Sequence, residues 1–183
     1  MLVATRETST RDPHSGRRGR AEPLANPTRP QLEWVMDHMR EEIRIEAPVE
    51  HVWAFLCDTS RWHDWAPRQE TSDWSGPYDR VGTTYISKMK MMGFEAKQTY
   101  TVLEVEPLKL IHEHSDTGPM ANFYRFEPEG DATRLIIESD WEMPGLIPGF
   151  IKNLMTKNWI ERNVRHMLGD FKALAEATVP AHA

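Results

Sequence analysis

The sequence predicts an α+β domain with a seven-stranded antiparallel sheet, two short helices after the first strand, and a long C-terminal helix. Residues 38–47 alternate strictly between apolar and polar side chains, and a period of two returns through most of 70–142. From 147 to 177 the apolar spacing changes to three and four, which is typical of a helix. Short turns join the predicted strands, which therefore pair antiparallel, because parallel neighbours need long crossovers.

The composition is that of one ordinary domain, with 183 residues, 22 Lys and Arg, 28 Asp and Glu, and one cysteine. A chain of this length can bury a core together with one internal pocket. Cys57 alone forms no intramolecular disulfide, so zinc ribbons and disulfide scaffolds are excluded and a reducing, cytoplasmic location is expected. No apolar run approaches the roughly 18 residues that span a bilayer, so we expect no transmembrane segment.

The first 30 residues differ from the rest of the chain in charge and composition. They contain six Arg, three acidic residues, four Pro and no aromatic residue, whereas residues 31–183 hold 16 basic and 25 acidic residues. Such a segment cannot bury enough apolar surface to offset chain entropy. We predict a disordered basic tail over 1–37, an ordered domain over 38–178 and a disordered end over 179–183. The acidic body would repel phosphate, so no nucleic-acid partner is expected.

The elements follow in order along the ordered part. After the strand 38–47, Pro48 begins a helix in which Val49, Val52, Trp53 and Leu56 recur at spacings of three and four. A second helical turn follows over 61–66 and ends at Pro67. Six more strands are predicted, each bounded by turn residues, over 70–75, 83–92, 94–105, 108–115, 120–127 and 133–142.

The C-terminal helical pattern contains two apolar stripes. The stripe from Ile160 to Ala175 is continuous, and the stripe over 147–155 is rotated from it by roughly 100°. Either the helix is kinked near Asn158, or its first half covers something different from what its second half covers. The Pro-Gly pairs at 144–145 and 148–149 suit a lid, an entrance to a cavity, or a homodimer contact through 147–159.

Placing charged residues outward assigns the two faces of the sheet. In the strand 108–115, Lys109, Ile111 and Glu113 are expected to point outward, and Leu110, His112 and His114 inward. The polar members of the predicted inner face are Gln98, Tyr100, His112, His114, Asn122, Tyr124 and Ser139. Buried polar groups are costly without partners, so this face predicts a hollow for water or a ligand between the sheet and the last helix.

The sequence resembles the START-like (SRPBCC) superfamily, and within it the polyketide cyclase/dehydrase branch. The resemblance is carried by IRIEAPVEHVWAFL at 43–56, by Asp58, Trp62 and Trp65, by the hairpin from FEP at 126–128 to TRL at 133–135, and by FKALAE at 171–176. It implies a helix-grip fold over about 38–177, in which the sheet curves around the last helix and encloses a hydrophobic cavity. It does not imply one activity, because the superfamily includes lipid carriers, hormone receptors and cyclases.

Two sets of candidate residues follow. The acid–base candidates for a catalytic role are His112, His114, Tyr100 and Tyr124. The candidates for ligand binding are Trp65, Tyr85, Met89, Met91, Gln98, Tyr100, His112, His114, Asn122, Tyr124, Ser139, Trp141, Met155 and Trp159. His112 and His114, with Asp116 beyond them, have the spacing of a metal pair. The START-like resemblance implies no metal, so we expect cavity hydrogen bonding there and no metal or cofactor.

Three functions remain open at this point. In the first, the domain binds a hydrophobic small molecule such as a lipid, isoprenoid or polyketide in its interior. In the second, it is a cyclase, aromatase or dehydrase that uses the same His and Tyr residues without metal. The aromatase/cyclases of this fold are expected to place an Arg in the pocket, and Arg125 and Arg134 are predicted outward here. In the third, it is a protein-interaction module that uses its exposed face.

Overall fold

The computed structural model describes residues 36–91, 94–118, 120–142 and 158–180. The predicted tail, up to residue 35, lies outside these residues. So do 143–157, which hold most of the segment predicted as a lid, an entrance or a dimer contact, and the last three residues. The rotated stripe and the kink near Asn158 are therefore predictions that fall outside the described part of the chain.

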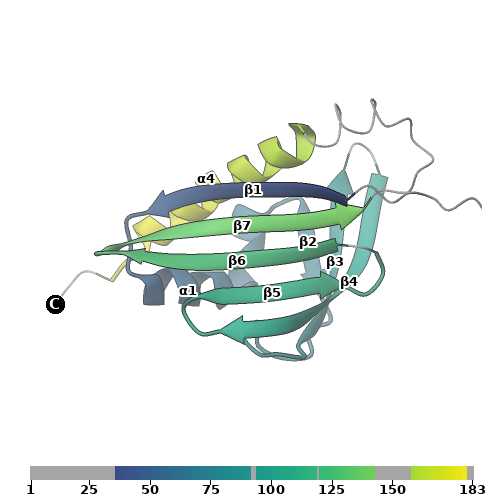
Figure 1. Ribbon diagram of the computed structural model, residues 1–183, viewed down its shortest axis with the longest axis horizontal. Coiled ribbons are helices and arrows are strands. Elements are labelled where there is room, and N and C mark those ends of the chain that lie inside the picture. The colour runs from purple at the N-terminus through teal and green to yellow at the C-terminus, as the bar shows by residue number, and fades with distance from the viewer. Residues whose placement is uncertain (1–35, 92–93, 119, 143–157, 181–183) are drawn as a thin grey trace, which may run out of the picture. The chain divides into compact units, whose positions relative to one another are not determined.

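The described part forms an antiparallel sheet with helices on one of its faces (Figure 1). The sheet has seven strands, as predicted, and their order is β1-β7-β6-β5-β4-β3-β2. The strands are β1 Met36–Ile45, β2 Gln69–Ser72, β3 Thr84–Met91, β4 Phe94–Glu106, β5 Leu110–Ser115, β6 Met120–Glu129 and β7 Ala132–Glu142. The helices are α1 Val49–Cys57, a short 3-10 turn Thr59–Arg61, α2 Trp62–Trp65 and α4 Asn158–Ala177.

The junction between β1 and α1 is fixed by Pro48 and by a side-chain hydrogen bond. Pro48 is the N-cap of α1, with an extended backbone at ψ 149°, and its carbonyl accepts from the N–H groups of His51 and Val52. The Thr133 hydroxyl of β7 donates to the Ala47 carbonyl at 2.8 Å. Both groups are buried, so this bond satisfies a backbone acceptor that the turn would otherwise leave unpaired.

Helix α4 packs across the sheet and contacts β1, α1 and α2. Its buried residues Leu168, Phe171 and Ala175 belong to the predicted stripe. The Arg165 guanidinium meets the Glu41 carboxylate at 2.6 Å, and the Lys172 ammonium donates to the Arg44 carbonyl at 2.6 Å, so polar contacts also tie α4 to β1. Within the described residues, no helix combines the length and the apolar character needed to cross a bilayer.

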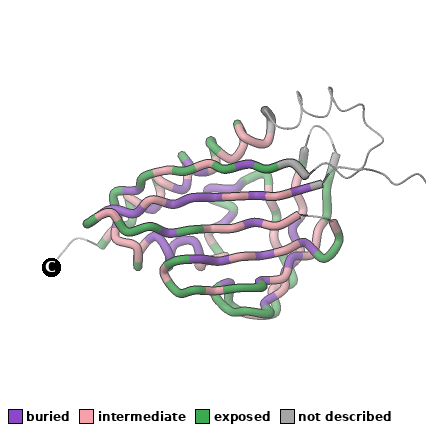
Figure 2. The backbone as a smooth tube through the Cα atoms, in the orientation of Figure 1, coloured by how far each residue is buried: buried purple, intermediate pink, exposed green. Residues whose placement is uncertain are grey.

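Burial alternates along most strands (Figure 2), as expected for a sheet with one covered face. The alternation shifts in β4, where the pairing with β5 has an irregularity between Val102 and Glu104. Val102 is fully buried, whereas Leu103 is 48% exposed. A bulge at this point places one extra residue in β4 and changes which residues beyond it face the core.

Candidate functional site

A buried carboxylate lies at the centre of the inner face of the sheet. Val102, Glu113, Asn122 and Ser139 are paired across β4, β5, β6 and β7, so their side chains share one face. Glu113 is only 1% exposed, and the other three are also buried. A buried carboxylate is unfavourable unless hydrogen-bond donors surround it, so its surroundings decide what it can do.

Glu113 receives hydrogen bonds on both of its carboxylate oxygens. The Tyr78 and Tyr85 hydroxyls donate to Oε2 at 3.0 and 2.8 Å. The Asn122 amide donates to Oε1 at 2.8 Å, and the Tyr124 hydroxyl lies 3.5 Å from the same oxygen. We call Glu113 with these four donors the Glu113 cluster. Its donors come from β3, β6 and the loop between β2 and β3, so the tertiary fold assembles it.

A second layer of hydrogen bonds orients the cluster. The Ser139 hydroxyl donates to Oδ1 of Asn122 at 2.8 Å, which turns the Asn122 amide nitrogen towards Glu113. Tyr100, by contrast, donates to Oε1 of Gln98 at 2.6 Å, and its hydroxyl also lies 3.0 Å from the Met120 sulfur. Tyr100 and Gln98 therefore form a neighbouring polar pair outside the Glu113 cluster.

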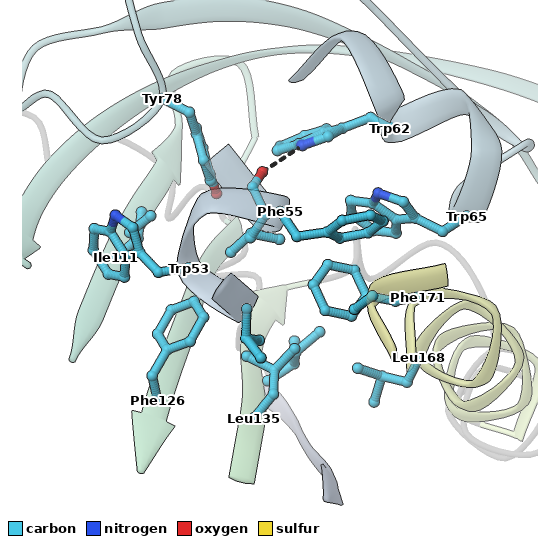
Figure 3. Close-up of a cluster of buried hydrophobic side chains, with 14 of the residues drawn as sticks. Trp53, Phe55, Trp62, Trp65, Tyr78, Ile111, Phe126, Leu135, Leu168 and Phe171 are labelled. Carbon is cyan, nitrogen blue, oxygen red and sulfur yellow. Dashed lines mark hydrogen bonds between the residues drawn. The ribbon is translucent and has the colours of Figure 1, made fainter. Parts of the chain in front are cut away.

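Aromatic rings enclose the cluster on the side of the helices. Tyr85 is stacked between Trp74 and Tyr100, at centroid distances of 4.1 and 5.3 Å. Trp62 meets Tyr78 edge-on at 4.9 Å, and its indole N–H donates to the Leu56 carbonyl at 2.8 Å (Figure 3). Figure 3 also shows Trp65 between Trp62 and the α4 residue Phe171. This packing removes water from the cluster and holds each phenol in place.

Burial controls the proton affinities of the cluster. It raises the pKa of Glu113 above the ordinary value of 4.5, although the hydrogen bonds from Asn122, Tyr85, Tyr78 and Tyr124 oppose this effect. Burial, followed by the charge of Glu113, raises the pKa values of Tyr78, Tyr85 and Tyr124 well above 10.0. The phenols therefore remain protonated donors, and Glu113 holds a proton more readily than an exposed glutamate does.

The predicted orientation of β5 is wrong. Ile111 and Glu113, expected to point outward, are buried, and the row that contains Glu113 faces the helices. His112 pairs with Phe123 in β6 and Glu104 in β4, and its ring stacks on Phe123 at 4.2 Å. His112 and His114 therefore lie on the outer face, and Leu110, opposite Arg125, is on that side as well. Burial against its neighbours lowers the pKa of His112 from 6.5.

The other predicted site residues divide into groups. Tyr85, Asn122 and Tyr124 belong to the Glu113 cluster, Ser139 supports it, and Gln98 and Tyr100 adjoin it. Trp141 is buried on β7. Met155 lies outside the described residues, and for Met91 and Trp159 only the backbone is described. Trp65 and Met89 line a separate cleft.

Two residues of the Glu113 cluster, Glu113 itself and Tyr78, are absent from the predicted set. Glu113 was excluded from the predicted inner face because charged residues were placed outward. Tyr78 was not found because it lies in a loop, where no periodicity marks buried residues. A signal for Glu113 was nevertheless present. Tyr100, Tyr124 and Asn122 were all predicted inward, and several buried donors together require an acceptor.

The cleft lies beside the cluster, between α2, the start of β2, β3 and α4. It has a volume of about 30 Å³. Its lining residues are Trp65, Ala66, Pro67, Arg68, Gln69, Met89, Asn163, His166, Met167 and Asp170. Met89 and the buried residues Ser87 and Tyr85 alternate along β3, so one strand face leads from the cleft to Glu113.

The described residues contain no group of three or more His, Cys, Asp or Glu side chains placed to hold a metal ion. His112 and His114 lie on the same face of β5, but Asp116 contacts Thr101 instead, accepting from its hydroxyl at 2.8 Å.

A curved antiparallel sheet that packs its inner face against a long C-terminal helix defines the START-like, helix-grip class of folds. A family model described as "Polyketide cyclase / dehydrase and lipid transport" matches residues 36–176. The chain belongs to this family, which the resemblance read from the sequence had predicted. Comparison with curated proteins gives no match.

Solved structures share the fold at low sequence identity. The protein TTHA0849 from Thermus thermophilus matches with a TM-score of 0.66 and 20% identity, over 79% of this chain and 100% of that chain. The Zhui aromatase/cyclase from Streptomyces sp. R1128 matches with 0.65 and 19%, over 80% and 98%. Norcoclaurine synthase from Thalictrum flavum, in complex with dopamine and hydroxybenzaldehyde, matches with 0.60 and 15%, over 88% and 100%.

Proposed function

We propose that this protein binds a hydrophobic small molecule that carries a polar oxygen group, and that the Glu113 cluster orients this group. The observation that carries the proposal is the enclosed carboxylate with donors on both oxygens. Apolar side chains at this place would cost less free energy to bury, because a buried carboxylate has to be compensated by several hydrogen bonds. Perturbed, enclosed titratable groups are enriched at functional sites, and the family is one of cyclases, dehydrases and lipid transport proteins.

The route to the cluster runs along the inner face of β3. The apolar side chains of Trp65, Met89 and Met167 line the cleft, and Ser87 and Tyr85 continue the same strand face. Methionine side chains adapt their shape to a guest more readily than branched residues do. Glu113 itself is enclosed, so a ligand would meet two half-buried residues at its edge, Tyr124 of the cluster and the adjoining Gln98.

Binding is tested with the neutral fluorescent probe N-phenyl-1-naphthylamine and with native mass spectrometry of the purified full chain. We expect a saturable fluorescence increase, with affinity on the order of micromolar, because burial of apolar surface is offset by lost translational freedom. Met89→Gln should weaken the probe several-fold, and Leu103→Gln on the exposed bulge is the matched control. A wild-type chain that binds no apolar probe and carries no co-purified small molecule contradicts the proposal.

A cyclase-type reaction is the second candidate, and the raised pKa of Glu113 favours it. A protonated Glu113 could deliver a proton through Tyr124 to a ligand carbonyl while water takes up the proton lost from the neighbouring carbon, which gives the enol. The donors on the two oxygens of Glu113 would stabilise the carboxylate left behind. The readout is hydrogen–deuterium exchange at the methyl group of acetophenone, followed by NMR. Exchange that the wild type accelerates and Glu113→Gln does not supports this reaction, and equal rates in both proteins count against it.

A further inference from the structure

A second depression adjoins the cleft. This depression has a volume of about 310 Å³ and is lined by Arg68, Arg162, Asn163 and His166. Arg68, Asn163 and His166 also line the cleft, so the two spaces are continuous. Arg68 comes from the turn between α2 and β2, and Arg162 from α4. We call this depression the rim groove.

Arg68 and Arg162 differ from most other arginines of the described residues. Arg40, Arg44, Arg61, Arg125, Arg134 and Arg165 each form an ion pair with a carboxylate. Within the described part of the chain, neither Arg68 nor Arg162 does. Residues 31–183 hold 25 acids and only 16 bases, so carboxylates are abundant. Two guanidinium groups are nevertheless left unpaired at the mouth of one groove.

The nearby carboxylates are already beside other cations. Asp170 lies 3.7 Å from His166, and Asp64 lies 2.9 Å from His63 and 3.7 Å from Arg61. Glu70 pairs with Lys90 at 3.4 Å. Asp170 is the acidic residue among those that line the cleft. Its single negative charge is outnumbered by the two positive charges of Arg68 and Arg162. The rim groove therefore keeps a net positive charge.

Trp65, which lines the adjoining cleft, carries an unsatisfied hydrogen-bond donor. Trp65 is 4% exposed and lines the cleft, and its indole Nε1 is buried without a hydrogen-bond partner among the described residues. A buried donor without an acceptor costs on the order of 1–3 kcal/mol. An acceptor oxygen brought by a ligand would remove this cost. The unpaired donor and the two arginines are independent observations. Each of them favours a ligand that carries oxygen acceptors.

We infer that the rim groove binds the anionic end of an amphiphilic ligand, with Arg68 and Arg162 as the cations and Trp65, Met89 and Met167 beneath its apolar part. The inference rests on the proposed function and narrows its ligand to molecules that carry a carboxylate, sulfonate or phosphate. Guanidinium groups suit such anions because their planar N–H donors can pair with two oxygens at once. Exposed ion pairs are weak, so the two arginines together should change affinity by roughly tenfold.

The test uses two probes that differ by one anionic group. 1-Anilinonaphthalene-8-sulfonate is the sulfonated form of N-phenyl-1-naphthylamine, so the apolar rings are the same. We expect Arg68→Gln with Arg162→Gln to weaken the sulfonate probe about tenfold more than the neutral probe, because only the sulfonate loses a charge partner while both probes meet the same change in the cleft lining. Arg80→Gln is the matched control, because Arg80 is exposed and has no ion pair within the described residues, and it lies outside both spaces. Raising the salt from about 0.02 M to about 0.5 M should weaken only the sulfonate probe.

The outcomes separate this inference from the proposed function. Equal loss of both probes in the double variant, or an unchanged affinity for the sulfonate, overturns the anion site while the neutral probe still tests the interior. Sedimentation with phosphatidylglycerol vesicles forms a second arm. A wild-type chain that pellets with these vesicles but does not bind the free sulfonate overturns the inference, because the arginines would then serve a membrane surface. Preference for the free sulfonate that the double variant loses supports it.

Discussion

The two faces of β5 hold titratable residues in opposite environments. Glu113 points to the helices, is 1% exposed and receives hydrogen bonds on both carboxylate oxygens. His112, its immediate neighbour, points to the outer face. It lies opposite Glu104 in β4 and opposite Phe123 in β6, and its ring stacks on that of Phe123. The acidic residue is therefore inside, and the imidazole is outside.

This difference shows that donors, and not formal charge, decide where a carboxylate can be placed. Tyr78, Tyr85 and Asn122 provide the donors on the inner side, and their own hydroxyl and amide groups would be left unpaired without Glu113. Glu113 and its donors can therefore be buried favourably only together. The outer side offers His112 only a ring to stack on and partly exposed charged neighbours, which suits an imidazole near the surface.

The largest expected effect comes from removing the carboxylate and leaving its donors. Glu113→Leu should lower the free energy of unfolding by about 3 kcal/mol or more, because at least two buried donors lose their acceptor. Urea denaturation followed by circular dichroism measures this change. Glu104→Ala, on the outer face of β4, is the matched control and should stay within about 0.5 kcal/mol. Equal effects of the two changes would remove the contrast between the faces.

A pH dependence should follow from the raised pKa of Glu113. The folded protein holds this proton more tightly than the unfolded chain, so the stabilising contribution is fully present below the ordinary pKa of 4.5 and is lost as the pH rises through the folded-state pKa. Within that interval the free energy of unfolding should fall by up to about 1.4 kcal/mol per pH unit.

Glu113→Gln serves as the reference for this measurement, because the amide keeps an acceptor oxygen and cannot titrate. The difference in unfolding free energy between wild type and Glu113→Gln, measured by urea titrations from acidic to mildly alkaline pH, should shift in favour of the variant as the pH rises. A difference that does not change with pH would show that Glu113 has the same proton affinity folded and unfolded.

A smaller effect is expected for the single tyrosines. Tyr78→Phe and Tyr85→Phe each remove one donor from Oε2 of Glu113 and keep the ring packing, so each should cost about 1 kcal/mol. The double variant should cost more than the sum, because Oε2 then has neither of its two donors. A double-mutant cycle in urea measures the coupling, and strict additivity would argue against a shared acceptor.

The smallest effect is expected on the outer face. His112→Ala should change stability by about 1 kcal/mol or less through the lost ring stacking, and His114→Ala by less. Neither should alter binding of N-phenyl-1-naphthylamine, whereas Asn122→Ala on the inner face should weaken it. Loss of binding in the histidine variants would restore the original expectation that these residues contact the ligand.

Much of the fold could be predicted because it depends on local patterns. The alternation in β1, the spacing of Val52, Trp53 and Leu56 in α1, and the turn residues between strands are each visible in the sequence, and the strand bounds differ from those predicted by a few residues. The inner residues of β6 and β7 were also assigned to the correct face, because charged residues in those strands do lie outside.

The site could be predicted only in part, because its centre depends on non-local contacts. Tyr78 reaches Glu113 from a loop 35 positions earlier, and no periodicity marks it. In β5 the apolar residues Leu110 and Ile111 are adjacent, so they could not fix the face, and the charge rule then placed Glu113 outside. The bulge at Leu103 is likewise invisible to a strict period of two.

The parallel stack of Trp74, Tyr85 and Tyr100 gives the molecule an optical signature of its own chemistry. Asymmetric near-ultraviolet absorption requires aromatic rings held in fixed orientations. Tyr85 is both the middle ring of this stack and a hydrogen-bond donor to Glu113, so the band from these rings should change when that acid gains or loses its proton. The protein thus carries a spectroscopic indicator at its centre that needs no added label.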